Sequence, residues 1–566
     1  MTKRVFLFSG HMIDQPDRPK PRFPAGDAGL AGHLIGMKLD EWRAGKNDLA
    51  VCSGACGGDI LFAEACLSRG LSLELHLPLP EEEFIRASVA FAGEDWVERY
   101  RNLRRHPAVR TLFLSADFRS GEDLNVFARN NLRMLESAFQ QQAAHVQFMA
   151  LWNGEAGDGE GGTRHMVESV RQSRGSVYIL KPQTMTLLER LKSPGPKRIL
   201  ALDGGGIRGA ITLGYLEKIE DLLRARHGNN PQFRLCDYFD LIGGTSTGAI
   251  IASALATGWS ARDIKKLYLE IGGKIFAKKW KAYLPWHTGK YLKARFGAEP
   301  LMEKLEEVFG DMTLGDGGVR TGLCIIAKRA DTQSTWPLIN HPEGKYYRHN
   351  APILLRNAVR ASTAAPTYFI PELFDVGFGQ QGAFVDGGVS MANNPALQLF
   401  LIATLKGFPF HWRTGGDNLM IVSIGTGMSR PVLRPEEVAN DKLWNWAVNI
   451  PDMLMQDASW LTQTILQYMS NTPTPWRIDG EIGDLSGDLI TPIPLLSYLR
   501  YNVFIEKEEL EDLGLGNLAV KPGIKSLQEM SEAANREHLA LIGEKAAAVQ
   551  IKSDHFPIGF NLSVQA

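Results

Sequence analysis

The stretch YFDLIGGTSTGAIIASALATG, from Tyr238 to Gly258, has the pattern of a strand, a tight turn and a helix. It begins with apolar residues, continues through Gly244-Thr245-Ser246-Thr247-Gly248 and ends in an alanine-rich segment. This order is typical of a nucleophile elbow, where only small residues fit beside a serine whose hydroxyl is left exposed at the start of a helix. We therefore predict an α/β fold with Ser246 as a candidate nucleophile and Gly244 and Gly248 as the small residues of its turn.

A glycine-rich run lies upstream, in ILALDGGGIRGAITLGYL from Ile199 to Leu216. Gly204, Gly206 and Gly209 have the G-x-G-x-x-G spacing of a dinucleotide-binding turn. That interpretation requires a second strand that ends in an acidic residue about 20 positions further on. The sequence there, EDLLRARHGNNPQF, has the pattern of a helix end and a polar loop. The dinucleotide interpretation therefore fails, and the glycines need another explanation.

A candidate base for the serine lies downstream, in GAFVDGGVSMANNPALQLF from Gly382 to Phe400. Asp386 follows a short apolar run and precedes two glycines, so a tight turn can aim its carboxylate at a hydroxyl. It could accept the serine's proton directly or orient a histidine that does so. The histidines that follow it, His411, His538 and His555, have no distinctive surroundings. The sequence therefore favours a base without histidine.

Three motifs in this order resemble those of the patatin-like phospholipases: DGGGIRG (Asp203 to Gly209), GTSTG (Gly244 to Gly248) and DGG (Asp386 to Gly388). The blocks AVRASTAAPTYF (358–369) and IVSIGTG (421–427) are similar to the segments before and after the aspartate in that family. The resemblance spans about residues 198 to 427. It implies an α/β hydrolase domain that cleaves acyl esters of membrane phospholipids.

The resemblance also implies a catalytic dyad, in which Ser246 attacks the ester carbonyl and Asp386 serves as base and then as acid. It implies no cofactor for catalysis. Two alternatives stay open: an acyltransferase, and a ligand-binding signalling protein with an inactive hydrolase scaffold. The glycine run would form the oxyanion hole, with Arg208 adding positive charge or holding the loop. The residues expected there are Gly204, Gly205, Gly206, Arg208 and Gly209.

The first 190 residues alternate short β-rich runs with helical stretches, which predicts a Rossmann-like, doubly wound parallel sheet. The runs are RVFLFSG, LAVCSG, LSLELHLPL, VRTLFLS, VQFMALWNG and GSVYILKP. Ligands of such sheets bind at the carboxyl ends of the strands, where glycine-rich turns favour anions. Glycines that simply make tight turns are the alternative. The candidate ligand-binding residues are Ser9, Gly10, Ser53, Gly54, Gly57, Gly58, Asp59, Gly161, Gly162 and Thr163.

This N-terminal pattern is loosely similar to nucleotide-sensing domains of bacterial signalling and defence proteins. The resemblance implies that a nucleotide second messenger of unknown identity activates the protein, as in anti-phage phospholipase effectors. LKSPGPK (191–197) interrupts the pattern and predicts a linker between a domain at 1–190 and the hydrolase core at 198–427. Residues 428–566 are expected to form a mostly helical extension of the hydrolase domain.

Two segments could contact partners. Lys274 to Phe296 contains aromatic and basic residues without an acidic one, which suits transient contact with a membrane surface or a lid packed on the core. KLWNWAVNIPDMLMQDASWLTQTILQYM (442–469) is apolar around much of its circumference and predicts a buried helix pair. That pair could cover the core, form a dimer contact or cover the acyl channel. Homo-oligomers thus remain an open alternative.

The overall charge and the cysteines exclude some functions. The formal net charge is -1, with 62 Lys and Arg against 63 Asp and Glu, so nothing pulls the whole protein toward nucleic acid. Five cysteines and no secretory segment predict a reducing, cytoplasmic compartment. Cys52 and Cys56 lack the second ligand pair of a zinc site, so we expect packing thiols and no metal. No apolar run is long enough to span a bilayer.

Overall fold

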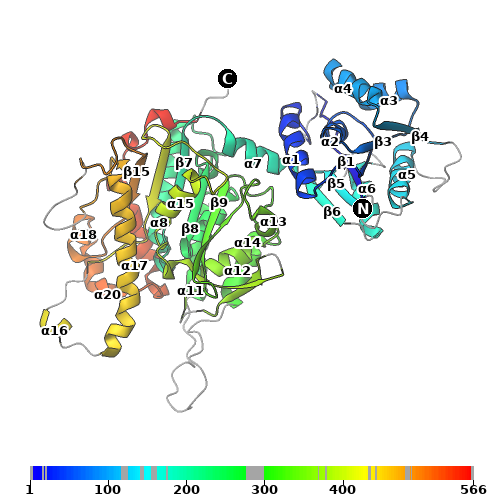
Figure 1. The fold of residues 1–566 in the computed structure, drawn as a ribbon. Helices are drawn as coiled ribbons and strands as arrows, with labels where there is room; N and C mark the ends of the chain where they lie inside the picture. The colour runs from blue at the N-terminus through cyan, green and yellow to red at the C-terminus, as the bar shows by residue number, and fades with distance from the viewer. Residues whose placement is uncertain are drawn as a thin grey trace, which may run out of the picture. The chain divides into compact units, whose positions relative to one another are not determined.

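The chain folds into two compact units, Met1–Glu189 and Arg190–Ala566, in the computed structural model (Figure 1). The structure describes residues 4–15, 18, 22–115, 125–140, 146–154, 162–173, 176–275, 299–366, 369–376, 379–430, 435–439, 443–477, 485 and 487–562. Each unit contains its own sheet, and each is described by itself below.

The first unit is built on a parallel sheet of six strands in the order β4-β3-β2-β1-β5-β6. All six predicted β-rich runs form its strands. Their bounds are Val5–Gly10 (β1), Leu49–Cys52 (β2), Ser72–Leu77 (β3), Val109–Phe113 (β4), Val146–Leu151 (β5) and Ser176–Leu180 (β6).

Helices cover both faces of this sheet because successive strand residues point to opposite sides. Phe6 and Phe8 of β1 pack with buried residues of α1 (Ala28–Glu41), α2 (Gly58–Leu67), α3 (Glu81–Ser88) and α4 (Glu94–Arg105). Val5 and Leu7 pack with residues of α5 (Val126–Gln140) and α6 (Thr163–Gln172). The unit is therefore doubly wound, as predicted, and its strand order reverses between β1 and β5.

The second unit contains a nine-stranded mixed sheet in the order β11-β12-β9-β8-β7-β13-β15-β14, with β10 paired to β9. The central strands run parallel, whereas β10 and β12 are antiparallel to β9 and β11 is antiparallel to β12. The predicted α/β class is confirmed. The bounds are Lys197–Leu202 (β7), Leu241–Thr245 (β8), Gly322–Arg329 (β9), Ser334–Ile339 (β10), Glu372–Asp375 (β11), Gln381–Asp386 (β12), Leu419–Ile424 (β13), Ser470–Asn471 (β14) and Leu496–Tyr501 (β15).

Helices also cover both faces of the second sheet. Ile242 of β8 belongs to a core shared with α8 (Gly209–Arg226) and α21 (Arg536–Gln550), which pack on one another. The next residue, Gly243, faces Leu399 of α15 (Ala396–Thr404) on the other side. A side chain at Gly243 would strike Leu399, so glycine lets α15 approach the sheet closely. Further helices are α10 (Thr247–Ala256), α11 (Ala261–Ile275), α12 (Glu299–Phe309) and α14 (Leu355–Ser362).

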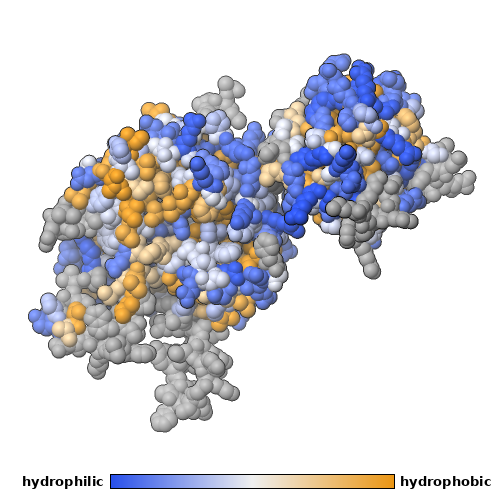
Figure 2. Space-filling model, viewed as in Figure 1, coloured by the Kyte–Doolittle hydropathy of each residue, from blue (hydrophilic) through white to orange (hydrophobic). Residues whose placement is uncertain are grey.

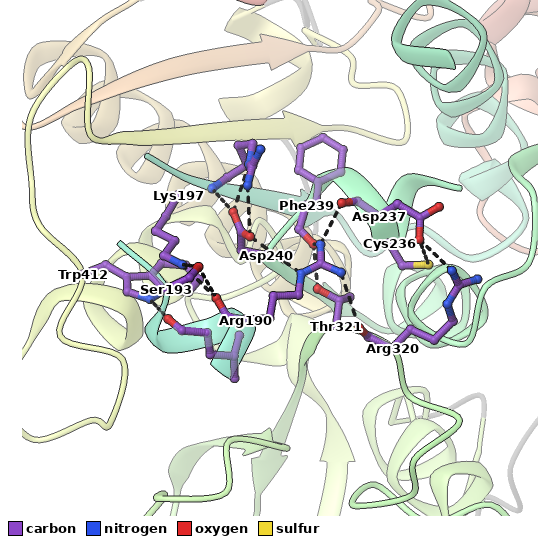
Figure 3. A network of polar contacts seen from close by, with 12 residues as sticks. Arg190, Ser193, Lys197, Cys236, Asp237, Phe239, Asp240, Arg320, Thr321 and Trp412 are labelled. Carbon is purple, nitrogen blue, oxygen red and sulfur yellow. Dashed lines mark hydrogen bonds and ion pairs between the residues drawn. The ribbon is translucent and has the colours of Figure 1, made fainter. Parts of the chain in front are cut away.

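The chain enters the second unit through α7 (Pro182–Lys192), and only residues 193–196 separate that helix from β7. Figure 3 shows the polar contacts that hold this part of the chain in place. Arg190 donates from Nη2 to the carbonyl oxygens of Asp237 and Phe239, both at 3.0 Å. Lys197 Nζ donates to Arg190 O at 2.9 Å, and Trp412 Nε1 donates to Leu191 O at 2.9 Å. The end of α7 is thereby tied to the second unit.

The C-terminal part contributes strands as well as helices. β14 and β15 extend the sheet beside β13, and α21 covers α8. The segment predicted as a buried helix pair is one helix, α17 (Leu443–Tyr468). Ile450, Met453, Leu454 and Leu461 on it are exposed, so the described part of this chain does not cover that face.

The described residues contain no helix that is both long and apolar enough to cross a bilayer. The five cysteines are buried and unpaired. Burial raises the pKa of the Cys52 and Cys66 thiols well above their usual value and that of Cys56 to about 12. These cysteines thus pack as apolar groups.

Candidate active site

Ser246 occupies the sharp turn between β8 and α10. Its backbone has φ 55° and ψ −123°, a conformation that non-glycine residues rarely adopt and that local contacts must hold in place. Ser246 N donates to Ser362 Oγ at 2.9 Å, and Ser362 Oγ donates to Ile326 O at 2.5 Å. Ser362 therefore anchors the elbow to β9. The motif search missed this role, although Ser362 lies in one of the blocks that resembled the family.

The predicted small residues of the elbow are required by close backbone contacts. A Cβ atom on Gly244 would lie 2.1 Å from Gly248 O, and one on Gly248 would lie 2.2 Å from Leu202 O. No side chain fits at either distance. Gly244 and Gly248 therefore let β8, α10 and the end of β7 approach one another.

Asp386 reaches Ser246 because of the strand register. Thr245 pairs with Ile326 of β9, and Asp386 pairs with the next residue, Ala327, although β12 runs the opposite way. The Ser246 side chain lies close enough to the Asp386 carboxyl to lower its pKa, and Gly388 N donates to that carboxyl at 2.7 Å. The structure thus brings the two predicted reactive residues together.

Burial raises the pKa of Asp386 to about 6. The Ser246 side chain and the Gly388 N–H oppose this rise, as does the positive charge of Arg360. Arg360 is fully buried, donates to Ile370 O at 3.1 Å and lies 5.0 Å from the centre of the Phe369 ring. At neutral pH the aspartate is mostly ionised and can accept a proton.

The glycine run forms a turn at the end of β7, beside the elbow. A Cβ atom on Gly204 would lie 3.2 Å from Ser246 Cβ, and one on Gly205 would lie 2.2 Å from Thr426 Oγ1. The N–H of Gly204 is already donated to Asn393 O at 3.1 Å. Among the described residues, none accepts a hydrogen bond from Gly205 N or Gly206 N. These two N–H groups are the donors that the turn can offer.

The remaining residues of the run hold the turn in place. Gly206 has φ +56°, and Tyr268 OH donates to its carbonyl oxygen at 2.5 Å. The same hydroxyl lies 2.6 Å from Thr247 Oγ1, so it joins the glycine turn to the elbow. Arg208 donates to Gln528 O at 3.2 Å, a contact that suits the predicted role of holding the loop. A Cβ atom on Gly209 would lie 2.9 Å from the hydroxyl oxygens of Thr247 and Tyr268.

A buried ion pair that the sequence did not reveal lies under this turn. Asp203 accepts from Arg500 Nη1 at 3.0 Å and from Nη2 at 2.6 Å, and Arg500 Nη1 also donates to Ser423 Oγ at 2.8 Å. Asp203 and Arg500 are 5% and 3% exposed. Arg500 lies on β15, far outside the motifs, and the sequence carries no spacing signal for such a pair.

A sequence profile of the patatin-like phospholipases matches residues 200–400. Patatin-T5 of Solanum tuberosum is 30% identical to this chain over 288 residues, which cover 47% of this chain and 71% of patatin-T5. The chain belongs to the patatin-like phospholipase family. Proteins of Escherichia coli and Vibrio cholerae, both named cGAMP-activated phospholipase, are 32% and 34% identical over 231 and 204 residues, or 40% and 35% of this chain. The chain spans 62% and 55% of the length of these two relatives.

The structure gives clear surroundings for two of the three histidines that follow Asp386. His555 hydrogen-bonds through Nδ1 with Tyr501 OH at 2.9 Å, and burial lowers its pKa. His411 follows Phe410 with a left-handed backbone, φ 50°. Neither geometry assigns a catalytic role to these residues.

Most candidate ligand residues of the first unit meet at one sheet edge. Ser9 and Gly10 end β1, Ser53 and Gly54 follow β2, and Gly57, Gly58 and Asp59 lie at the start of α2. Gly58 N donates to His11 O at 3.1 Å, and a Cβ atom on Gly57 would lie 2.8 Å from Ile13 N. These glycines therefore let the chain after β1 pack directly against the turn.

The carboxyl of Asp59 lies in the turn after β2, where the sequence predicts a site for an anionic ligand. Its carboxyl is buried and accepts a hydrogen bond from Ala55 N at 3.3 Å, and burial raises its pKa to about 7. Backbone N–H groups of Ala55, Gly10, Gly54 and Ser53 oppose this rise. The turn thus contains its own acceptor. Chain packing gives these glycines one role, and their predicted role in ligand binding stays a prediction.

Some predicted residues lie elsewhere or outside the described part. Gly162 precedes α6, and Thr163 begins it with its side chain buried. Gly161 and nearly all of the basic, aromatic segment at 274–296 lie outside the described residues. Among the residues that are described, no group of three or more His, Cys, Asp or Glu side chains is arranged to hold a metal ion.

Proposed function

We propose that this protein is a lipid acyl hydrolase that cleaves acyl esters of phospholipids through Ser246 and Asp386. The observation that carries the proposal is the position of Ser246, which stands at a strained elbow beside the buried Asp386 carboxyl and lowers its pKa. A strained serine beside a base is a common arrangement for nucleophilic catalysis. Membership of the patatin-like phospholipase family supports an acyl ester as substrate.

The proposed reaction has two steps. Ser246 Oγ attacks the ester carbonyl carbon while Asp386 accepts the hydroxyl proton. The leaving alcohol then takes that proton as the tetrahedral intermediate collapses to an acyl-enzyme. Asp386 next accepts a proton from water, which attacks the acyl-enzyme, and the fatty acid leaves as the serine regains its proton. No metal or redox partner is needed to balance these steps.

The developing negative charge on the carbonyl oxygen needs donors close to Ser246. We assign this role to Gly205 N and Gly206 N, because the Gly204 N–H is donated to Asn393. Thr426, Tyr268 and the chain at Met530 hold the turn, as Met530 O accepts Ile207 N at 2.9 Å. Donors fixed before the reaction need no reorganisation as charge develops.

The first test is fatty-acid release from phospholipid vesicles by the wild type, Ser246→Ala and Asp386→Asn. We expect each substitution to lower release by about 1,000-fold or more. Release by Ser246→Ala at the wild-type rate would contradict the assignment. Adding an acceptor alcohol and analysing the products separates hydrolysis from acyl transfer, since a transferase makes a new ester in place of the free acid.

We also propose that a nucleotide activates the protein through its first unit. Two observations support this: two relatives are named cGAMP-activated phospholipase, and doubly wound sheets bind ligands where their strand order reverses. Calorimetric titration of the full chain with cyclic dinucleotides, NAD and ADP-ribose tests binding. Fatty-acid release with and without each compound tests activation. Absence of both heat and stimulation with all of them would contradict this part of the proposal.

A further inference from the structure

Exposed aliphatic side chains lie on the loop that joins the two halves of the candidate site. Val389 is 46% exposed and Met391 is 74% exposed. This loop begins at Asp386, whose pKa Ser246 lowers, and at its end Asn393 O accepts the N–H of Gly204. The two aliphatic side chains therefore stand at the rim of the site, between the base and the glycine turn.

Helix α17 continues this apolar surface. It contacts the turn Gly387–Val389, where Met455 Cε would lie 3.6 Å from a Cβ atom on Gly388. The helix exposes Ile450, Met453 and Leu454, which are 45%, 49% and 62% exposed. Residues three and four positions apart share one face of a helix, so these side chains form one stripe. Figure 2 shows hydrophobic residues gathered along α17.

The chemistry of these side chains favours one kind of partner. Three of the five are Val, Ile or Leu and two are Met, and none is Tyr, Trp or Arg, the residues that carry most of the binding energy at protein interfaces. The sequence of α17 contains no Lys or Arg and has two acidic residues, Asp452 and Asp457. The surface therefore suits insertion among lipid chains better than attraction to anionic headgroups or to a charged protein.

We propose that an apolar rim, made of Val389, Met391, Ile450, Met453 and Leu454, docks the protein on a lipid bilayer. The inference rests on the proposed function, because a lipid substrate must pass from the bilayer to Ser246. Docking through the rim places the loop from Asp386 to Asn393 against the membrane surface. Since the contact is apolar, vesicle binding depends little on salt and needs no anionic lipid.

The test measures binding separately from catalysis. Binding is measured by sedimentation with phosphatidylcholine vesicles, in full-length Ser246→Ala protein so that the vesicles stay intact. Adding Met453→Glu and Leu454→Glu together removes two apolar contacts, and we expect vesicle affinity to fall about tenfold or more. The matched control is Ile558→Glu, at a residue 82% exposed. Ile558 lies near Phe560, whose carbonyl oxygen accepts a hydrogen bond from Arg198 at the start of β7. Ser246 lies near the opposite end of that strand.

Activity separates the docking proposal from the function proposal. With Ser246 intact, the ratio of vesicle hydrolysis to hydrolysis of a water-soluble short-chain ester should fall about tenfold in the double variant and stay unchanged in Ile558→Glu. Equal binding by the double variant and the control overturns the apolar rim, as does binding that requires anionic lipid. A dimer that the double variant splits, seen by light scattering, assigns the surface to a second copy and also overturns it. If the wild type does not hydrolyse the soluble ester, that result contradicts the proposed function and not the docking proposal.

Discussion

At the scale of single residues, the environment of Asp386 sets the pH dependence. A base must be ionised, and burial raises the pKa of this carboxyl to about 6. We therefore expect kcat/KM for a soluble ester to rise with pH through about 6 and then to level off. Because the Arg360 charge lowers this pKa, Arg360→Met should move the inflection to higher pH. A profile without an inflection between about pH 5 and about pH 7 would exclude Asp386 as the base.

The buried carboxyl of Asp386 lowers the free energy of unfolding at neutral pH. Its folded pKa lies above the ordinary 3.8, so its stabilising contribution is complete below about pH 3.8 and is lost as pH rises through about 6. A shift of about 2 pKa units corresponds to about 3 kcal/mol. Asp386→Asn should thus unfold at higher denaturant concentration than the wild type at pH 7, by up to that amount, while losing activity. A less stable variant would show that the hydrogen bonds outweigh the buried charge.

At the scale of elements, motif order predicted the strands, turns and helices around the site, because each motif is local. Ser246, Asp386 and the glycine turn follow from strand, turn and helix patterns that a few neighbouring residues define. Arg500 could not be found in this way, since its contact with Asp203 depends on β15 lying beside β13 in the sheet. The exposed face of α17 was missed for a related reason: an apolar pattern does not reveal which side has a partner.

The Asp203–Arg500 pair links β15 to the glycine turn and gives an element-level prediction. Arg500→Met leaves a buried carboxylate without its cation, which should cost about 3–5 kcal/mol in urea unfolding and lower ester hydrolysis. Asp203→Asn combined with Arg500→Met removes both charges and should recover much of that stability. A single variant as stable as the wild type would mean that the pair does not hold the turn.

The contact between β7 and α10 gives a second prediction at the scale of elements. Gly248→Ala would bring a Cβ atom within 2.2 Å of Leu202 O, so the elbow must shift and activity should be lost. Gly407→Ala is the matched control, because nothing lies within 4 Å of its Cβ position. It should change the melting temperature by about 1 to 3 °C at most and leave hydrolysis intact. Equal activity of the two variants would contradict the close approach.

At the scale of the whole molecule, the division at Arg190 predicts where the chain can be cut. A fragment of residues 190–566 keeps the contacts of Arg190, Leu191 and Lys197 and should melt cooperatively near the temperature of the second unit in the full chain. A fragment that starts at Arg198 lacks these contacts and should melt several degrees lower, as circular dichroism can measure. Equal melting would show that the contacts in Figure 3 add no stability.

The position of Arg500 near the end of the chain also affects the timing of synthesis. A ribosome has already made both reactive side chains once Asp386 has emerged, yet Asp203 lacks its cation until another 114 residues, from Gly387 to Arg500, have been added. The ion pair under the glycine turn thus forms only late in translation. Nascent chains and products of premature termination would therefore carry the serine and the aspartate without this ion pair.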